Sequence, residues 1–83
     1  MRLTLKYRRG DRIYNIRRKW DKKERKFIPA VRCTKFLSYL IYPEEETRIY
    51  YKCAASDHWY DIKNCYPTRE KALKAIDKGV EGE

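Results

Sequence analysis

Apolar and polar residues alternate along several stretches of this chain, and this period of two constrains the fold more than any other feature. The clearest stretch is 12–20, RIYNIRRKW, in which a β-strand would place alternate residues on opposite faces. One face would carry Tyr14, Ile16, Arg18 and Trp20, and the other would carry Ile13, Asn15, Arg17 and Lys19. The first half of this strand is apolar on both faces, whereas the second half is almost entirely basic.

Similar patterns predict an antiparallel sheet of about five strands, curled or barrel-like. We predict strands at residues 2–8, 12–20, 26–33, 48–54 and 58–63. The stretch 34–42 fits a helix and a buried strand about equally, and we favour the strand because Tyr and Ile are enriched there. Gly10 would close a tight turn between the first two strands. Pro29 lacks an amide hydrogen, so the third strand should lie at an edge or carry a bulge. Turns are expected at 21–25, 43–46 and 55–57.

A helix is expected near the C-terminus. Thr68 is a typical N-cap, Glu70 lies in the first turn, Lys74 lies late and Gly79 would end the helix. Its inner stripe would consist of Ala72, Leu73 and Ile76. The expected fold class is therefore α+β, with one helix covering a small sheet, in a single domain over residues 1–79 followed by a flexible tail at 80–83.

Length and composition indicate a small folded protein. A chain of 83 residues buries only about 60–65% of its unfolded surface, so its core is thin. Aromatic residues make up 14% of the chain, which argues against disorder despite 40% charged residues. The three widely spaced cysteines do not form the framework of a secreted protein, and no stretch fits a signal peptide or a membrane span. We therefore expect a cytoplasmic protein that does not bind membranes. The absence of Gln and the scarcity of Asn and Met are typical of thermophiles.

Positive charge is concentrated in the first part of the chain. The formal net charge is +9, but residues 1–35 hold 14 Lys and Arg against three acidic residues, a net charge of +11. The remainder holds seven basic and nine acidic residues, a net charge of −2. Solubility does not require one sign in one place, whereas a focused positive field attracts anions such as phosphates. We interpret this segment as an anion-binding face, with a solvated hairpin as the alternative.

The basic segment is the candidate nucleic-acid site, because a basic two-stranded ribbon can enter a major groove while its loop charges contact phosphates. Its residues are Arg8, Arg9, Arg12, Arg17, Arg18, Lys19, Trp20, Lys22, Lys23, Arg25 and Lys26. For Trp20, we expect core packing, with stacking on an unpaired base or an Arg plane as the alternative. The pattern does not distinguish DNA from RNA or duplex from single strand.

Two other kinds of site are weaker. Three cysteines and one histidine are the right ligand types for tetrahedral zinc, but the paired C-x2-C spacing is missing. That set is Cys33, Cys53, His58 and Cys65. An acid–base group could form from Asp57, His58 and Asp61, beside Ser56, although this stretch is more simply a turn. Since no catalytic motif is present, we expect neither an enzyme nor a bound cofactor, and zinc is kept only as an alternative.

The second half of the chain is rich in tyrosine and tryptophan, which suggests an alternative function. One sheet face would pack on the helix, and the other could form a protein interface, where these residues are enriched. The aromatic set is Tyr39, Tyr42, Tyr50, Tyr51, Trp59, Tyr60 and Tyr66. The alternative is therefore a protein-binding regulator or inhibitor, of the kind that viruses and mobile elements encode, or a homodimer formed through an edge strand.

Overall fold

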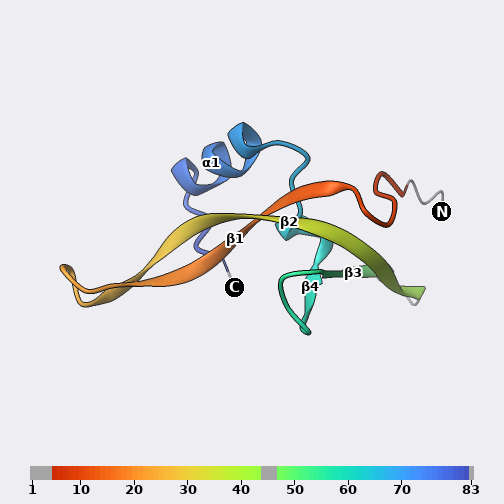
Figure 1. The fold of residues 1–83 in the computed structure, drawn as a ribbon, viewed down its shortest axis with the longest axis horizontal. Coiled ribbons are helices and arrows are strands. Elements are labelled where there is room, and N and C mark those ends of the chain that lie inside the picture. The colour runs from red at the N-terminus through yellow and green to blue at the C-terminus, as the bar shows by residue number, and fades with distance from the viewer. Residues whose placement is uncertain (1–4, 44–46, 83) are drawn as a thin grey trace.

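The computed structural model describes residues 5–43 and 47–82, and it is an α+β fold, as the sequence predicts (Figure 1). Its strands are β1 (Arg12–Asp21), β2 (Lys26–Pro43), β3 (Thr47–Cys53) and β4 (Trp59–Asp61). A 3-10 helix, η1 (Ile62–Asn64), and an α-helix, α1 (Arg69–Asp77), follow. The four strands form one open antiparallel sheet in the order β1-β2-β3-β4. None of the helices in the described ranges is long and apolar enough to cross a membrane.

Strand β2 organises the sheet, because it pairs with β1 over its first half and with β3 over its second half. The register shifts between Phe36 and Ser38, where β2 changes partner. The stretches predicted at 26–33 and 34–42 are thus parts of one strand of 18 residues, and the preference for a strand over 34–42 is confirmed. Pro29 pairs opposite Arg18 in the half of β2 that has a partner strand on one side only, as expected for an edge position. The predicted turn at 43–46 falls largely outside the described residues.

The strand predicted at 2–8 is wrong where it can be checked, because residues 5–8 have no strand conformation and residues 2–4 lie outside the described part. The edge of β1 that such a strand would need is already occupied. Tyr14 and Tyr66 exchange two backbone hydrogen bonds of 2.9 and 2.8 Å. The side chain of Asn64 accepts from the Ile16 N–H at 2.9 Å and donates to the Ile16 carbonyl at 3.0 Å. The segment before β1 must therefore leave this edge.

That N-terminal segment instead packs onto the core through Tyr7. The predicted turn is present, with Gly10 at φ 94°, and the Tyr7 ring stacks on Phe36 with centroids 5.8 Å apart. The Tyr7 N–H donates to the Tyr39 hydroxyl at 2.7 Å, and the Tyr7 hydroxyl donates to the Cys65 carbonyl at 3.2 Å. Burial raises the pKa of Tyr7, so this phenol keeps its proton.

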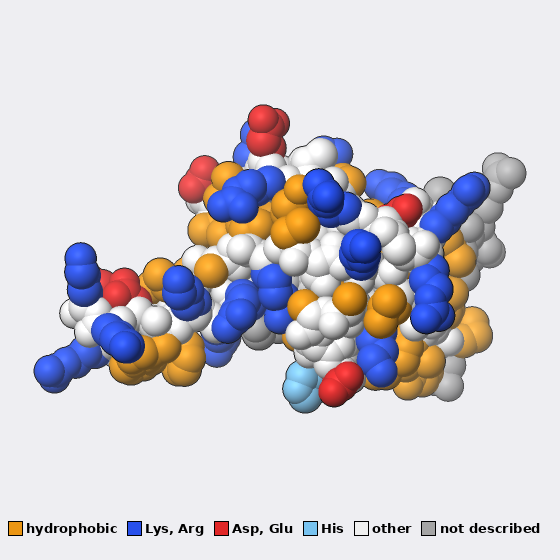
Figure 2. All heavy atoms as spheres, in the orientation of Figure 1, with side chains coloured by type: hydrophobic (Ala, Val, Ile, Leu, Met, Phe, Trp, Pro, Cys, Tyr) orange, Lys and Arg blue, Asp and Glu red, His pale blue; other side chains and the backbone are white. Residues whose placement is uncertain are grey.

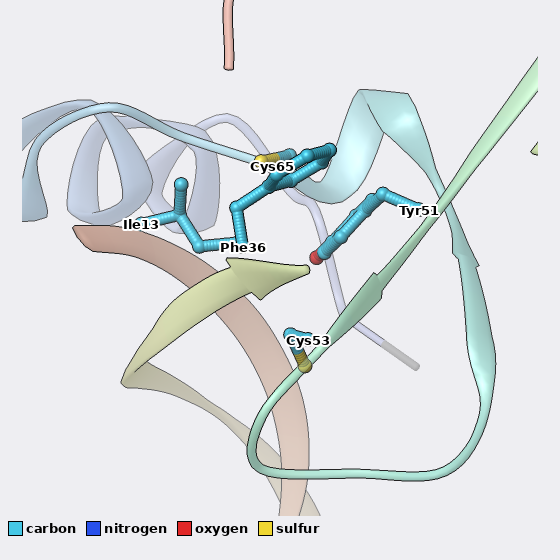
Figure 3. Close-up of a cluster of buried hydrophobic side chains, with 5 residues drawn as sticks. All are labelled: Ile13, Phe36, Tyr51, Cys53 and Cys65. Atoms are coloured by element: carbon cyan, nitrogen blue, oxygen red, sulfur yellow. The ribbon is translucent and has the colours of Figure 1, made fainter. Parts of the chain in front are cut away.

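The core lies where β1, β2 and β3 meet the segment after η1. Its buried cluster consists of Ile13, Phe36, Tyr51, Cys53 and Cys65 (Figure 3). A polar network runs beside it. The Asn15 Nδ2 donates to the Tyr51 hydroxyl at 3.1 Å, and Arg32 Nε donates to Asn15 Oδ1 at 3.1 Å. The Tyr51 hydroxyl in turn donates to the Asn64 carbonyl. Within the described ranges, every buried side-chain nitrogen and oxygen has a hydrogen-bond partner, as a stable buried network requires.

Helix α1 begins and ends where the sequence predicts and packs on β1 and β2 (Figure 1). Thr68 Oγ1 accepts from the Lys71 N–H at 3.3 Å, and Gly79, at φ 100°, donates to the Ile76 carbonyl at 3.0 Å. Ala72 is fully buried, but Leu73 is 45% exposed, so its place in the inner stripe is wrong. A helix of nine residues buries only a narrow stripe, and Leu73 lies 100° around the axis from Ala72.

Residues 80–82 run back along β1. A Cβ atom on Gly82 would lie 2.7 Å from the Ile16 carbonyl oxygen, so only glycine fits at this approach. The flexibility of the tail at 80–83 stays a prediction.

Candidate nucleic-acid interface

A two-stranded ribbon projects from the body of the molecule (Figure 1). We call residues 17–30 the arm; it runs from the pair Arg17–Ala30 to the pair Asp21–Lys26 and includes the turn between them. The arm begins where the sequence turns from apolar to charged, directly after the buried residue Ile16. The ribbon extends into solvent, and the molecule measures 45 × 28 × 24 Å.

The tip of the arm is a turn held by one carboxylate. Asp21 Oδ1 accepts from the Lys23 N–H at 2.9 Å, and Arg25 takes the left-handed conformation with φ 52°. Such conformations are uncommon for residues other than glycine and are typical of tight turns. The predicted charged, exposed turn at 21–25 is confirmed as a turn over residues 22–25.

The arm carries a dense, largely unpaired positive charge (Figure 2). It holds seven Lys and Arg against Asp21 and Glu24, a net charge of +5. All seven cations are exposed. The single ion pair found among the described residues joins Arg18 to Glu81 at 3.8 Å, with both side chains more than half exposed. A pair of this kind contributes little, so the positive field of the arm remains available to an anion.

The structure divides the predicted basic set into two groups. The arm carries Arg17, Arg18, Lys19, Trp20, Lys22, Lys23, Arg25 and Lys26. The other group, Arg8, Arg9 and Arg12, is also exposed but lies at the opposite end of β1. At about 3.4 Å per residue, Arg12 is roughly 30 Å from the tip of the arm. One continuous contact through all eleven residues would therefore have to span the whole length of β1.

The two faces of the arm differ in character. Residues paired across the ribbon share a face, so Arg18 and Trp20 lie with Pro29 and Phe27. The opposite face carries Arg17, Lys19, Lys26, Ile28 and Ala30. The Trp20 and Phe27 rings meet edge to face with centroids 5.1 Å apart, and they are 49% and 62% exposed.

The expectation that Trp20 packs in the core is wrong. It lies four residues beyond Ile16, the last buried residue of β1, and its side chain is half exposed. Phe27 was absent from the predicted site. The signal for it was present in the sequence, because a turn at 21–25 places residue 27 close to opposite residue 20 in a hairpin.

The four proposed zinc ligands do not come together. Cys53 and Cys65 are buried, whereas Cys33 and His58 are exposed. No three His, Cys, Asp or Glu side chains in residues 5–43 and 47–82 lie close enough to hold one metal ion. Cys53 Sγ instead accepts from Asn15 Nδ2 at 3.8 Å, and burial raises the pKa of Cys65 to about 12. A thiol that keeps its proton is a poor metal ligand.

The residues of the proposed acid–base group stabilise local backbone. Ser56 Oγ accepts from the His58 N–H at 3.2 Å, within the turn between β3 and β4. Asp61 Oδ1 accepts from the Lys63 N–H at 2.9 Å and so caps η1. These contacts account for Ser56 and Asp61 as turn and cap residues. The absence of enzymatic activity stays a prediction.

The aromatic set of the second half divides between the two sheet faces. Tyr39, Tyr51 and Tyr60 are aligned across β2, β3 and β4 and pack in or against the core. The opposite face carries Tyr42, Tyr50 and Trp59. Tyr42 and Trp59 are 48% and 42% exposed, and Lys52 Nζ lies 5.9 Å from the Trp59 ring. Tyr66 pairs with Tyr14 at the edge of β1.

Comparison with known protein families, with curated proteins and with solved structures finds no match for this chain.

Proposed function

We propose that the protein binds nucleic acid through the arm, mainly by contacts to the phosphate backbone. The observation that carries this proposal is the projecting ribbon with seven exposed cations, of which only Arg18 has an acidic partner among the described residues. Free cations held on a defined ribbon can displace the counterions that condense on a nucleic acid, and this release drives binding.

The shape of the arm supports a nucleic acid over a small anion. Two β-strands form a ribbon narrow enough for a major groove about 12 Å wide. The cations lie on both faces and in the turn, so they could contact several phosphates of one polymer at once. No enclosed cluster of cations of the kind that holds a single phosphate is needed for this mode of binding.

Fluorescence anisotropy with labelled duplex DNA, single-stranded DNA and RNA tests the proposal. Binding should be tight at 50 mM salt and should weaken about a thousandfold or more by 200 mM if six phosphates are contacted. Failure to bind any of the three at 50 mM salt would overturn the proposed function.

A second candidate function is binding of a protein partner through the outer face of β2, β3 and β4. The observation that favours it is the exposure of Tyr42 and Trp59 on the face of the sheet opposite the core cluster. Exposed Tyr and Trp are enriched in protein interfaces. Pull-down from a nuclease-treated lysate separates the two candidates, because a stoichiometric protein partner retained after nuclease supports this one. Light scattering shows whether that partner is a second copy of the chain.

A further inference from the structure

An open hollow adjoins the face of the arm that carries Trp20 and Phe27, which we call the aromatic face. Its volume is about 210 Å³, and it is lined by Arg18, Phe27, Pro29 and Glu81. The strands supply Arg18, Phe27 and Pro29, whereas Glu81 comes from the segment after α1, which runs back along β1. The hollow thus combines an aromatic ring and a proline with one guanidinium and one carboxylate.

The exposed rings beside this hollow are unusual for such a charged part of the chain. Trp20 is 49% exposed and Phe27 62% exposed, and neither ring belongs to the buried core cluster or packs against it. In an edge-to-face pair, the contact covers one face of one ring, so it leaves other ring faces open. Open aromatic faces among cations are the arrangement on which proteins stack unpaired bases.

The chemistry of the hollow fits a nucleobase. A base is a flat ring that stacks on aromatic side chains and presents hydrogen-bond donors and acceptors at its edge. Phe27 offers a stacking surface, the Arg18 guanidinium offers donors and the Glu81 carboxylate offers acceptors. The cations of the arm would neutralise the phosphates on either side of that base.

We propose that the face of the arm that carries Trp20 and Phe27 stacks an unpaired base against these two rings, with the edge of the base in the hollow lined by Arg18, Phe27, Pro29 and Glu81. The preferred partner is therefore single-stranded nucleic acid. This inference rests on the proposed function and narrows it. In a duplex, base faces are stacked on one another and only their edges reach the grooves, so ring faces on the ribbon would gain little there.

The test compares two double variants that leave the charge unchanged. W20L/F27L keeps an apolar cross-strand pair but removes both ring faces, whereas Y42L/W59L removes two similarly exposed rings from the outer face of the sheet. Each is titrated against a thymidine oligonucleotide of about 20 nucleotides and against a duplex of the same length, a length that exceeds the site of one small domain. We expect W20L/F27L to lose about 5- to 150-fold in affinity for the single strand and less than twofold for the duplex. Y42L/W59L should match the unaltered protein on both.

Three results would overturn the inference. W20L/F27L could bind the single strand as well as the unaltered protein does, it could lose affinity equally for single strand and duplex, or Y42L/W59L could show the larger loss. The first two results leave the proposed function intact, since binding through the cations of the arm remains, whereas the third would place the contact on the outer face of the sheet. Failure of the unaltered protein to bind any nucleic acid would instead reject the proposed function itself. Failure of the inference and failure of the proposed function can therefore be distinguished.

A fluorescence measurement covers the case in which W20L/F27L perturbs the arm. The chain has two tryptophans, so W59F leaves Trp20 as the only one. Stacking of a base on Trp20 should quench its emission on addition of the thymidine oligonucleotide, and the duplex should quench it much less. Unchanged emission at saturating oligonucleotide would contradict the inference whatever the double variant does.

Discussion

Reversing three charges on the arm tests whether the arm is the binding element. The variant R17E/R18E/K19E changes the net charge of residues 17–30 from +5 to −1. All three side chains are exposed and extend from consecutive positions of β1. The change therefore alters the electrostatic potential at the surface of the arm and leaves the packing of the core as it is. We expect binding to duplex and single-stranded nucleic acid at 50 mM salt to be abolished.

The salt dependence gives the expected magnitude. If all seven arm cations contact phosphates, the slope of log affinity against log salt on duplex DNA should be about −6, a loss of several thousandfold between 50 and 200 mM. Replacing the same three residues by Gln leaves four arm cations and a slope of about −4. Anisotropy titrations at four or more salt concentrations would measure both slopes.

The matched control changes the same number of cations, all of them lysines, on α1 and at its end. The side chains of Lys71, Lys74 and Lys78 are exposed, so K71E/K74E/K78E alters the total charge by the same amount as the arm variant. It should retain most of the affinity. The opposite pattern, with the helix variant losing binding and the arm variant retaining it, would place the site on α1 and refute the reasoning.

Thermal unfolding of the arm variant decides whether these side chains are structural. Arg18 loses its exposed pair with Glu81, and Arg17 and Lys19 lose no described ion pair, so the free energy of unfolding should change by less than about 1 kcal/mol. A much larger loss of stability would show that the arm cations support the fold, and the functional interpretation of the charge would then be wrong.

Four further predictions concern the body of the protein. N64A leaves the backbone N–H and carbonyl of Ile16 without their partners and should lower the free energy of unfolding by about 1–3 kcal/mol in urea titrations. G82A should displace the C-terminal segment, since its Cβ would lie 2.7 Å from the Ile16 carbonyl; unchanged amide shifts in β1 would contradict this. Burial raises the pKa of Cys65 from 9.0 to about 12, so as the pH rises the unfolded chain releases this proton before the folded chain does. The contribution of Cys65 to the free energy of unfolding is therefore fully present below pH 9 and should be lost as the pH rises towards 12. Alkaline unfolding curves would check this, and a thiol reagent at pH 8 should label the exposed Cys33 alone.

Sequence reasoning succeeded where the relevant information is local. The N-cap at Thr68, the helix end at Gly79 and the turn predicted at 21–25 depend on residues within one or two turns of chain. The cap and the helix end are confirmed, and the turn is confirmed over residues 22–25. The two faces of β1 follow from alternation alone, and the register with β2 confirms them. The exposure of the basic half of β1 could also be predicted, because Arg17, Arg18 and Lys19 follow one another without an apolar residue.

The errors arose where a distant segment decides the outcome. Alternation at residues 2–8 fits a strand, but it cannot show that Asn64 and Tyr66 occupy the edge of β1 that this strand would need. Asn64 lies 48 residues from Ile16 in the sequence, and nothing local marks their contact. The position of Trp20 depends likewise on how far the body of the protein extends along β1, which alternation does not report.

The two asparagines explain why a thin domain can carry a projecting arm. Asn15 and Asn64 are the only two asparagines in the chain, and both are buried at the base of the arm. Asn15 is bonded to Tyr51 and Arg32, while Asn64 holds the backbone of Ile16, the last residue before the arm. These hydrogen bonds fix the root of the ribbon against β2, β3 and η1, so the arm extends from a rigid base. Binding of a ligand then orders mainly the exposed side chains of the arm, because the backbone of the arm is already fixed. This lowers the entropic cost of binding.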